Sequence, residues 1–209
     1  MPKMELKIFI VLFCALFTGG HALQCYECLG LNGSCVSKMT TCPDTDECAS
    51  VTMIQNNGGT EVTIQYKGCR GMKSCISGSV NLGAISSVTS TQCCNTDLCN
   101  SKDAPVYSSK TPNGKQCYYC DDATSCLNKL NCSGEDDHCI TAIATNGSLS
   151  VTVKGCASKS LCDAAPVFQV PQMHLKISCC QGSLCNGAKS VTQNLLFLLW
   201  PLFFYILIH

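Results

Sequence analysis

The sequence predicts an all-β, disulfide-rich protein that contains two tandem copies of one small domain. Three observations predict this fold class. The chain has 21 cysteines, their spacing repeats, and the longer segments between them alternate apolar and polar residues. Twenty of the cysteines lie between residues 23 and 186. An even number of cysteines in a secreted chain indicates complete pairing, because disulfides persist in oxidising compartments.

The two copies share their endings and their cysteine order. CCNTDLCN at residues 93–100 is repeated as CCQGSLCN at residues 179–186, both copies open with Gln-Cys-Tyr, and both contain Lys-Gly-Cys. The expected domains are therefore residues 23–100 and 117–186. Residues 101–116 contain two prolines and several charged side chains, which is typical of a solvated linker.

Each copy is too small to be stabilised by apolar burial alone, so disulfides are expected to supply the scaffold. Zinc is the alternative for closely spaced cysteines, but it requires thiolates, which a secreted and fully oxidised chain does not offer. Residues 23–186 carry 11 basic and 13 acidic side chains, a net charge of −2. This balance excludes a basic surface for nucleic acid or heparin.

A long β-hairpin is predicted between the fifth and sixth cysteines of each copy. Residues 49–68 alternate around Asn56-Asn57-Gly58-Gly59, and residues 140–155 alternate around Asn146-Gly147. Asparagine and glycine tolerate the positive φ angles of tight hairpin turns. These segments show no helical period of any length, which agrees with the predicted all-β fold class.

Both ends of the chain carry targeting patterns. Two lysines, an apolar run at residues 8–17 and small residues predict a cleaved signal peptide at residues 1–22. At the other end, small residues, a polar spacer and the apolar residues 195–209 predict a glycosylphosphatidylinositol (GPI) attachment signal. The predicted attachment residue is Asn186, within a range that extends to Ser190, and residues 187–209 would be removed. A short membrane span or a secreted form is the alternative.

The cysteine order, the Gln-Cys-Tyr opening and the CC-x4-CN ending resemble the lymphocyte-antigen-six/urokinase-receptor (LU) family. Its domains have the three-finger fold shared with snake neurotoxins, and the resemblance covers both copies. Spacing alone leaves roughly nine hundred pairings open in each copy. The resemblance implies five disulfides per domain: Cys25–Cys48, Cys28–Cys35, Cys42–Cys69, Cys75–Cys93 and Cys94–Cys99, then Cys117–Cys139, Cys120–Cys126, Cys132–Cys156, Cys162–Cys179 and Cys180–Cys185.

The resemblance also implies that the terminal asparagine of each copy, Asn100 and Asn186, bonds backbone groups in the disulfide knot. No catalytic residue, metal ligand or cofactor site is predicted, since residues 23–186 contain only His138 and His174 as histidines and no unpaired cysteine. The acidic residues 135–137 before His138 are interpreted as a solvated turn, because acidic residues recur at the same place in the first copy.

The expected function is that of a GPI-anchored glycoprotein on the outer leaflet of the plasma membrane. It would bind an extracellular protein as a receptor, adhesion or modulator protein. A secreted two-domain inhibitor of an extracellular enzyme, such as a phospholipase, is the alternative.

Three N-glycosylation sequons bear on where the ligand would bind. They begin at Asn32, Asn131 and Asn146, and the cysteine in the middle of the second disfavours its use. A glycan at Asn146 would shield the hairpin tip of the second domain, so the contact is expected in the first. The predicted ligand contacts are Met53, Asn56, Asn57 and Thr60, with Phe168 as a candidate in the second domain.

Overall fold

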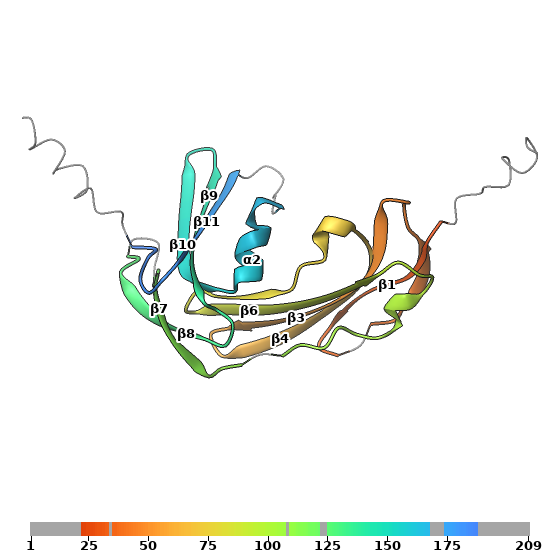
Figure 1. Ribbon diagram of the computed structural model, residues 1–209, viewed down its shortest axis with the longest axis horizontal. Helices are drawn as coiled ribbons and strands as arrows, with labels where there is room; N and C mark the ends of the chain where they lie inside the picture. Colours follow the sequence, from red (N-terminus) through yellow and green to blue (C-terminus); the bar gives the residue numbers. More distant parts are fainter. Residues whose placement is uncertain (1–21, 34, 108, 122–124, 168–173, 188–209) are drawn as a thin grey trace, which may run out of the picture. The chain divides into compact units, whose positions relative to one another are not determined.

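The computed structural model describes residues 22–33, 35–107, 109–121, 125–167 and 174–187 (Figure 1). The described residues form eleven β-strands: β1 (Gln24–Leu31), β2 (Lys38–Thr41), β3 (Asp46–Asn57), β4 (Thr60–Gly71), β5 (Gly78–Asn81), β6 (Ile85–Cys94), β7 (Pro112–Tyr119), β8 (Asn128–Ser133), β9 (His138–Asn146), β10 (Leu149–Ala157) and β11 (His174–Gln181). The helical elements are short: η1 (Met72–Ser74), η2 (Cys99–Ser101), α2 (Lys159–Ala164) and η3 (Ala165–Val167).

The described chain forms two compact units that do not coincide with the two sequence repeats. The first contains the residues up to Gln55 together with Gly59–Ser77 and Val88–Tyr107. The second contains the later residues and also Asn56–Gly58 and Gly78–Ser87. Two short pieces of the first repeat therefore pack with the second repeat.

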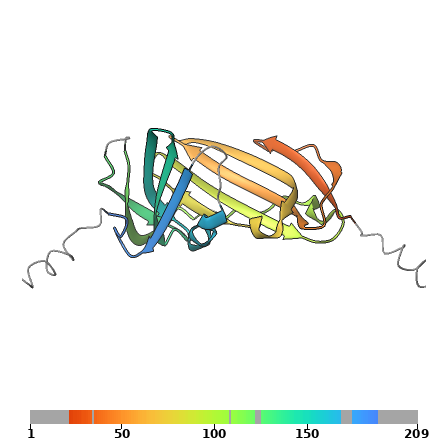
Figure 2. The same cartoon turned by 90° about the horizontal axis from the view of Figure 1, so that it is seen from above.

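The strands of the first unit follow the order β6-β3-β4-β1-β2. Strands β3, β4 and β6 lie side by side in both views (Figures 1 and 2). Gly58 and Gly59 connect β3 to β4 with φ angles of 56° and 92°. Glycine adopts these angles without steric cost, which explains the turn at this predicted position.

The second unit has the strand order β11-β9-β10-β5, with β7 and β8 paired in a separate sheet. Strands β9 and β10 are in antiparallel register from Leu149 opposite Asn146 to Ala157 opposite His138. Gly147 supplies a φ angle of 59° at the connecting turn. Both predicted hairpins are therefore present in the described residues.

The buried hydrophobic clusters of the described residues consist of cysteines. Four cysteines of the second repeat form one buried cluster, against which Leu130 and Cys180 pack. Three cysteines of the first repeat form the other, and Leu23 packs against it. Among fully buried side chains of the described residues, the largest are cysteines. The disulfides thus replace the aliphatic core that chains of this size cannot build.

The predicted all-β fold class is confirmed, and the described residues add one short α-helix to it. Residues Lys159–Ala164 (KSLCDA) form the six-residue helix α2, which Figure 1 places beside β9 and β11. Six residues span fewer than two helical turns, so no apolar period can be recognised in the sequence. The corresponding place in the first repeat has only the short helix η1.

Candidate functional site

Ten disulfides hold the two repeats, and none joins one repeat to the other. The structure contains the pairs that the family resemblance implies: Cys25–Cys48, Cys28–Cys35, Cys42–Cys69, Cys75–Cys93, Cys94–Cys99, Cys117–Cys139, Cys120–Cys126, Cys132–Cys156, Cys162–Cys179 and Cys180–Cys185. Adjacent cysteines at the end of each repeat serve two different bridges. Neighbouring side chains on a strand point to opposite faces, which makes this division possible.

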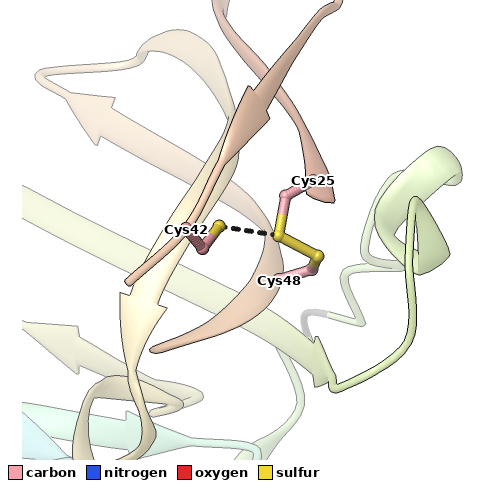
Figure 3. Close-up of side chains that lie close together, drawn as sticks. All are labelled: Cys25, Cys42 and Cys48. Atoms are coloured by element: carbon pink, nitrogen blue, oxygen red, sulfur yellow. Dashed lines mark hydrogen bonds between the residues drawn. A yellow bond between two sulfur atoms is a disulfide. The ribbon is translucent and has the colours of Figure 1, made fainter. Parts of the chain in front are cut away.

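Two disulfides pack against each other at the base of each repeat. In the first repeat, the Sγ atom of Cys42 lies 2.9 Å from that of Cys25, which is bonded to Cys48 (Figure 3). The corresponding distance between Cys132 and Cys117 is 3.4 Å. Such groups of three sulfurs resemble metal sites in their spacing. Every sulfur in them belongs to a disulfide, however, and a disulfide sulfur is not the thiolate ligand that zinc requires.

The terminal asparagine of each repeat bonds the backbone of two strands. Asn100 accepts a hydrogen bond from the Tyr26 amide at 2.9 Å, and it donates to the carbonyl oxygens of Tyr26 at 2.9 Å and Ala49 at 3.0 Å. Asn186 makes the equivalent three bonds with the backbone of residues 118 and 140. Both side chains are buried, so each amide links two strands by hydrogen bonds inside its repeat.

The acidic turn before His138 differs from the expected solvated turn. Asp136 is only 5% exposed, and its carboxylate accepts a hydrogen bond from the Ser79 hydroxyl. Burial raises the pKa of Asp136. The neighbouring Asp137 is half-buried, and its carboxylate lies 2.7 Å from Nδ1 of His138. This hydrogen bond lowers the pKa of Asp137. These carboxylates therefore do not converge on one metal position.

The first finger, formed by β1 and β2 of the first repeat, exposes large apolar side chains. Leu29 is 72% exposed and Leu31 is 65% exposed. They stand two residues apart on β1 and so share one face of the strand. Register places Leu29 opposite Tyr66 and Leu31 opposite Ile64 on β4, so these four side chains lie on the same face.

The other face of these strands carries polar contacts to the start of the linker. The Lys67 ammonium group is buried and lies 3.0 Å from the Asp103 carboxylate. The Gln65 amide donates to the same carboxylate at 3.0 Å, and Ala104 is 3% exposed. The start of the linker thus pairs with the polar side chains of one face, while Leu29 and Leu31 are exposed on the other face.

The predicted ligand contacts lie around the central hairpin of the first repeat. Met53 and Asn56 are half-buried in β3, whereas Asn57 and Thr60 are exposed on either side of the glycine turn. The turn is not isolated, because the Gly58 amide donates to the carbonyl oxygen of Ala84 at 3.0 Å. Phe168 lies outside the described residues. The exposed leucines of the first finger were not among the predicted contacts, since Leu29 and Leu31 are separated by Gly30 and form no continuous apolar run.

All three sequon asparagines are exposed. The Oδ1 atom of Asn32 accepts a hydrogen bond from the Thr63 amide at 3.1 Å, and Oδ1 of Asn131 accepts one from the Gln116 side chain at 2.8 Å. These bonds do not use the amide nitrogen to which a glycan would be attached. Asn146 ends β9 at the hairpin turn.

Two family models match the chain, one over each repeat. The u-PAR/Ly-6 domain model matches residues 21–102, and the model of snake toxins and toxin-like proteins matches residues 115–186. The chain belongs to the LU family. This LU protein has two tandem three-finger domains and belongs to a non-enzymatic family.

Relatives of this LU protein include the rat urokinase plasminogen activator surface receptor, which is 31% identical over 81% of the chain and 56% of the receptor. The mouse Ly6/PLAUR domain-containing protein 3 is 27% identical over 82% of the chain and 55% of that protein. The LU protein thus spans about half the length of these relatives. The crystal structure of mouse TEX101 matches 77% of this chain and 99% of the TEX101 chain, with 19% identity and a TM-score of 0.34.

No helix among the described residues is long and apolar enough to cross a membrane. The predicted signal peptide, except for its last residue, and the predicted GPI signal after Gly187 lie outside the described residues.

Proposed function

We propose that this protein is a GPI-anchored cell-surface glycoprotein that binds an extracellular protein through the first finger of its first repeat. The observation that carries the proposal is the concentration of exposed apolar side chains in that finger. Four of the ten large apolar side chains that are exposed among the described residues lie between residues 29 and 39: Leu29, Leu31, Val36 and Met39. Apolar surface concentrated in this way is typical of protein interaction sites. The exposed sequon at Asn32 lies in the same finger, so the proposal requires that Asn32 carries no glycan in the ligand-binding form, because a glycan there would shield these side chains.

The relatives support a surface location. One group carries the name of a surface receptor for urokinase plasminogen activator, and the apolar C-terminus of this chain fits a lipid-anchor signal. The side chain of Asn186 is buried and makes three hydrogen bonds. The enzyme that transfers the lipid anchor must reach its attachment residue, so this burial favours attachment of the anchor just downstream, within residues 187–190. The ligand of the relatives is not assigned to this chain.

A binding experiment tests the first-finger proposal. A dimeric fusion of residues 23–187 would be applied to cultured cells and binding would be measured by flow cytometry. We expect the Leu29→Ser/Leu31→Ser variant to lose binding at least about tenfold, because it removes buried apolar contact from the interface. The matched control is Leu127→Ser/Leu149→Ser, since those leucines are 73% and 67% exposed in the second repeat.

Equal binding by the first variant and the wild-type protein would contradict the proposal. Loss of binding after Asn57→Asp or Thr60→Glu alone would instead place the ligand at the central hairpin tip. The anchor is tested separately by treating intact cells with phosphatidylinositol-specific phospholipase C. Release of the protein is expected, and retention with an intact C-terminal peptide would show that no lipid anchor is present.

A further inference from the structure

We propose that the β5–β6 hairpin tip of the first repeat, residues 78–87, is an integral part of the second unit and holds the two repeats together without a covalent bond. Strand β5 pairs with β10, with Asn81 opposite Cys156 and Val80 opposite Ala157. Strand β10 pairs with β9 along its other edge. The strand from the first repeat thus covers an edge that the second repeat alone would leave open.

Buried polar groups continue this pairing beyond the strands. The Ser158 amide donates to the Ser79 carbonyl oxygen at 2.9 Å, and the Ser79 amide donates to the Ser158 hydroxyl oxygen at 2.9 Å. The Ser79 hydroxyl donates to the Asp136 carboxylate. Ser158 and Asp136 are 2% and 5% exposed. Removal of the hairpin would exchange these hydrogen bonds for bonds to water, so each bond contributes modestly and the bonds act together with the strand pairing.

Glycines from both repeats allow the close approach. A Cβ atom added to Gly78 would lie 2.7 Å from the Ser158 hydroxyl oxygen and 3.2 Å from Cβ of Leu161. A Cβ atom on Gly155 would lie 2.0 Å from the carbonyl oxygen of Asn81, closer than real Cβ atoms come to backbone oxygen. Larger residues at either position would therefore separate the hairpin from its site.

The fit extends to the loop at the end of β5. A Cβ atom on Gly83, whose φ angle is +92°, would lie 2.4 Å from the ring of Tyr119 in the second repeat. Strand pairing, buried polar contacts and close glycine packing thus converge on the same ten residues. The surface of the second repeat formed by β10, Ser158 and Asp136 fits one partner, the β5 segment of the first repeat.

This arrangement has a consequence for cleavage of the linker. Because no disulfide joins the repeats, a cut between them leaves only non-covalent contacts. Tyr107 in the linker is 88% exposed and offers a position for an engineered cleavage site. If the hairpin belongs to the second unit, the two fragments remain associated after cleavage.

The test uses the full chain, expressed in cells and purified in mild detergent, with a site for a sequence-specific protease inserted after Tyr107 and a different affinity tag on each side. After cleavage, the first fragment is captured by its tag and the second is detected in the captured material. A dilution series then gives the dissociation constant of the fragments. We expect co-purification for the wild-type chain, and a dissociation constant higher by about tenfold or more for Gly78→Val.

Gly71→Val is the matched control, because its added side chain has room, with the nearest atom at 4.0 Å, and its φ angle of −58° suits any residue. If Gly78→Val does not reach the folded, fully oxidised state, Ser79→Ala and its control Ser86→Ala replace this pair. Separation of the wild-type fragments on cleavage would overturn the proposal. So would equal association of the paired test and control variants.

Discussion

Substitution of Asn100 should reveal how much one buried amide contributes to an LU domain. Asn100→Ala leaves three backbone groups without their partner: the amide and carbonyl of Tyr26 and the carbonyl of Ala49. Each unsatisfied buried group costs about 1–3 kcal/mol, and water can reach the half-buried Tyr26, so we expect a loss of about 3–5 kcal/mol in the free energy of unfolding. Asn128→Ala, at an exposed position on β8, should change stability by less than about 0.5 kcal/mol.

Asn100→Asp distinguishes hydrogen bonding from packing, because it preserves the shape of the side chain. One carboxylate oxygen can still accept from the Tyr26 amide, but the other would face two carbonyl oxygens in place of a donor. The destabilisation should therefore be as large as that of Asn100→Ala at pH 7. It should become smaller near pH 4, where the buried carboxyl binds a proton and donates once.

Guanidinium unfolding of the oxidised protein at both pH values, followed by circular dichroism, measures these differences. A loss below about 1 kcal/mol for Asn100→Ala, or an Asn100→Asp variant whose destabilisation is the same at both pH values, would show that the Asn100 hydrogen bonds do not stabilise the domain as described.

Three further outcomes follow from single side chains. Burial raises the pKa of Asp136 above its usual 3.8, so the native state keeps this proton at pH values where the unfolded chain has lost it. Stability therefore falls as the pH rises from about 4 through the raised pKa. Asp136→Asn should flatten this fall in unfolding experiments between pH 4 and pH 7, and an unchanged slope would contradict it. Among the described residues, the Thr52 hydroxyl is buried without a partner, so Thr52→Val should raise the unfolding free energy by about 1 kcal/mol, whereas destabilisation would indicate a bound water. Cys94→Ser leaves Cys99 unpaired and should prevent surface expression seen by antibody staining, while Cys14→Ser in the predicted signal peptide should not; normal expression of the first would count against the importance of this bridge.

Cysteine spacing was enough to predict the repeats, and alternation around glycine was enough to predict the two long hairpins. The pairing of the cysteines was not available from spacing, and only the family resemblance selected the pairs that the structure contains. The buried state of Asp136 was beyond sequence reasoning, because its partner Ser79 lies 57 residues earlier in the chain. An acidic run next to a turn resembles solvated surface unless that distant contact is known.

The exposed leucines and strand β5 were missed for a similar reason. Alternation in β1 indicates a strand but does not tell which face a later segment will cover, and here the start of the linker covers the face of Lys67. Strand β5 has only the four residues Gly-Ser-Val-Asn, too few for a periodic pattern. Its role depends on the fit of Gly78 and Gly155 to neighbouring atoms, which composition does not encode.

The pairing of β5 with β10 also affects the order of events during synthesis. Ser79 and Ser158 are separated by 79 residues, so the first repeat can complete its own disulfides well before the partner of its third hairpin exists. At ribosomal rates of roughly 5–20 residues per second, that strand waits about 4–16 seconds in the secretory pathway with one edge unpaired. During this interval it is an open template for other extended chains. Chaperones of the endoplasmic reticulum should therefore contact residues 78–81 in nascent chains and release them once the second repeat has emerged.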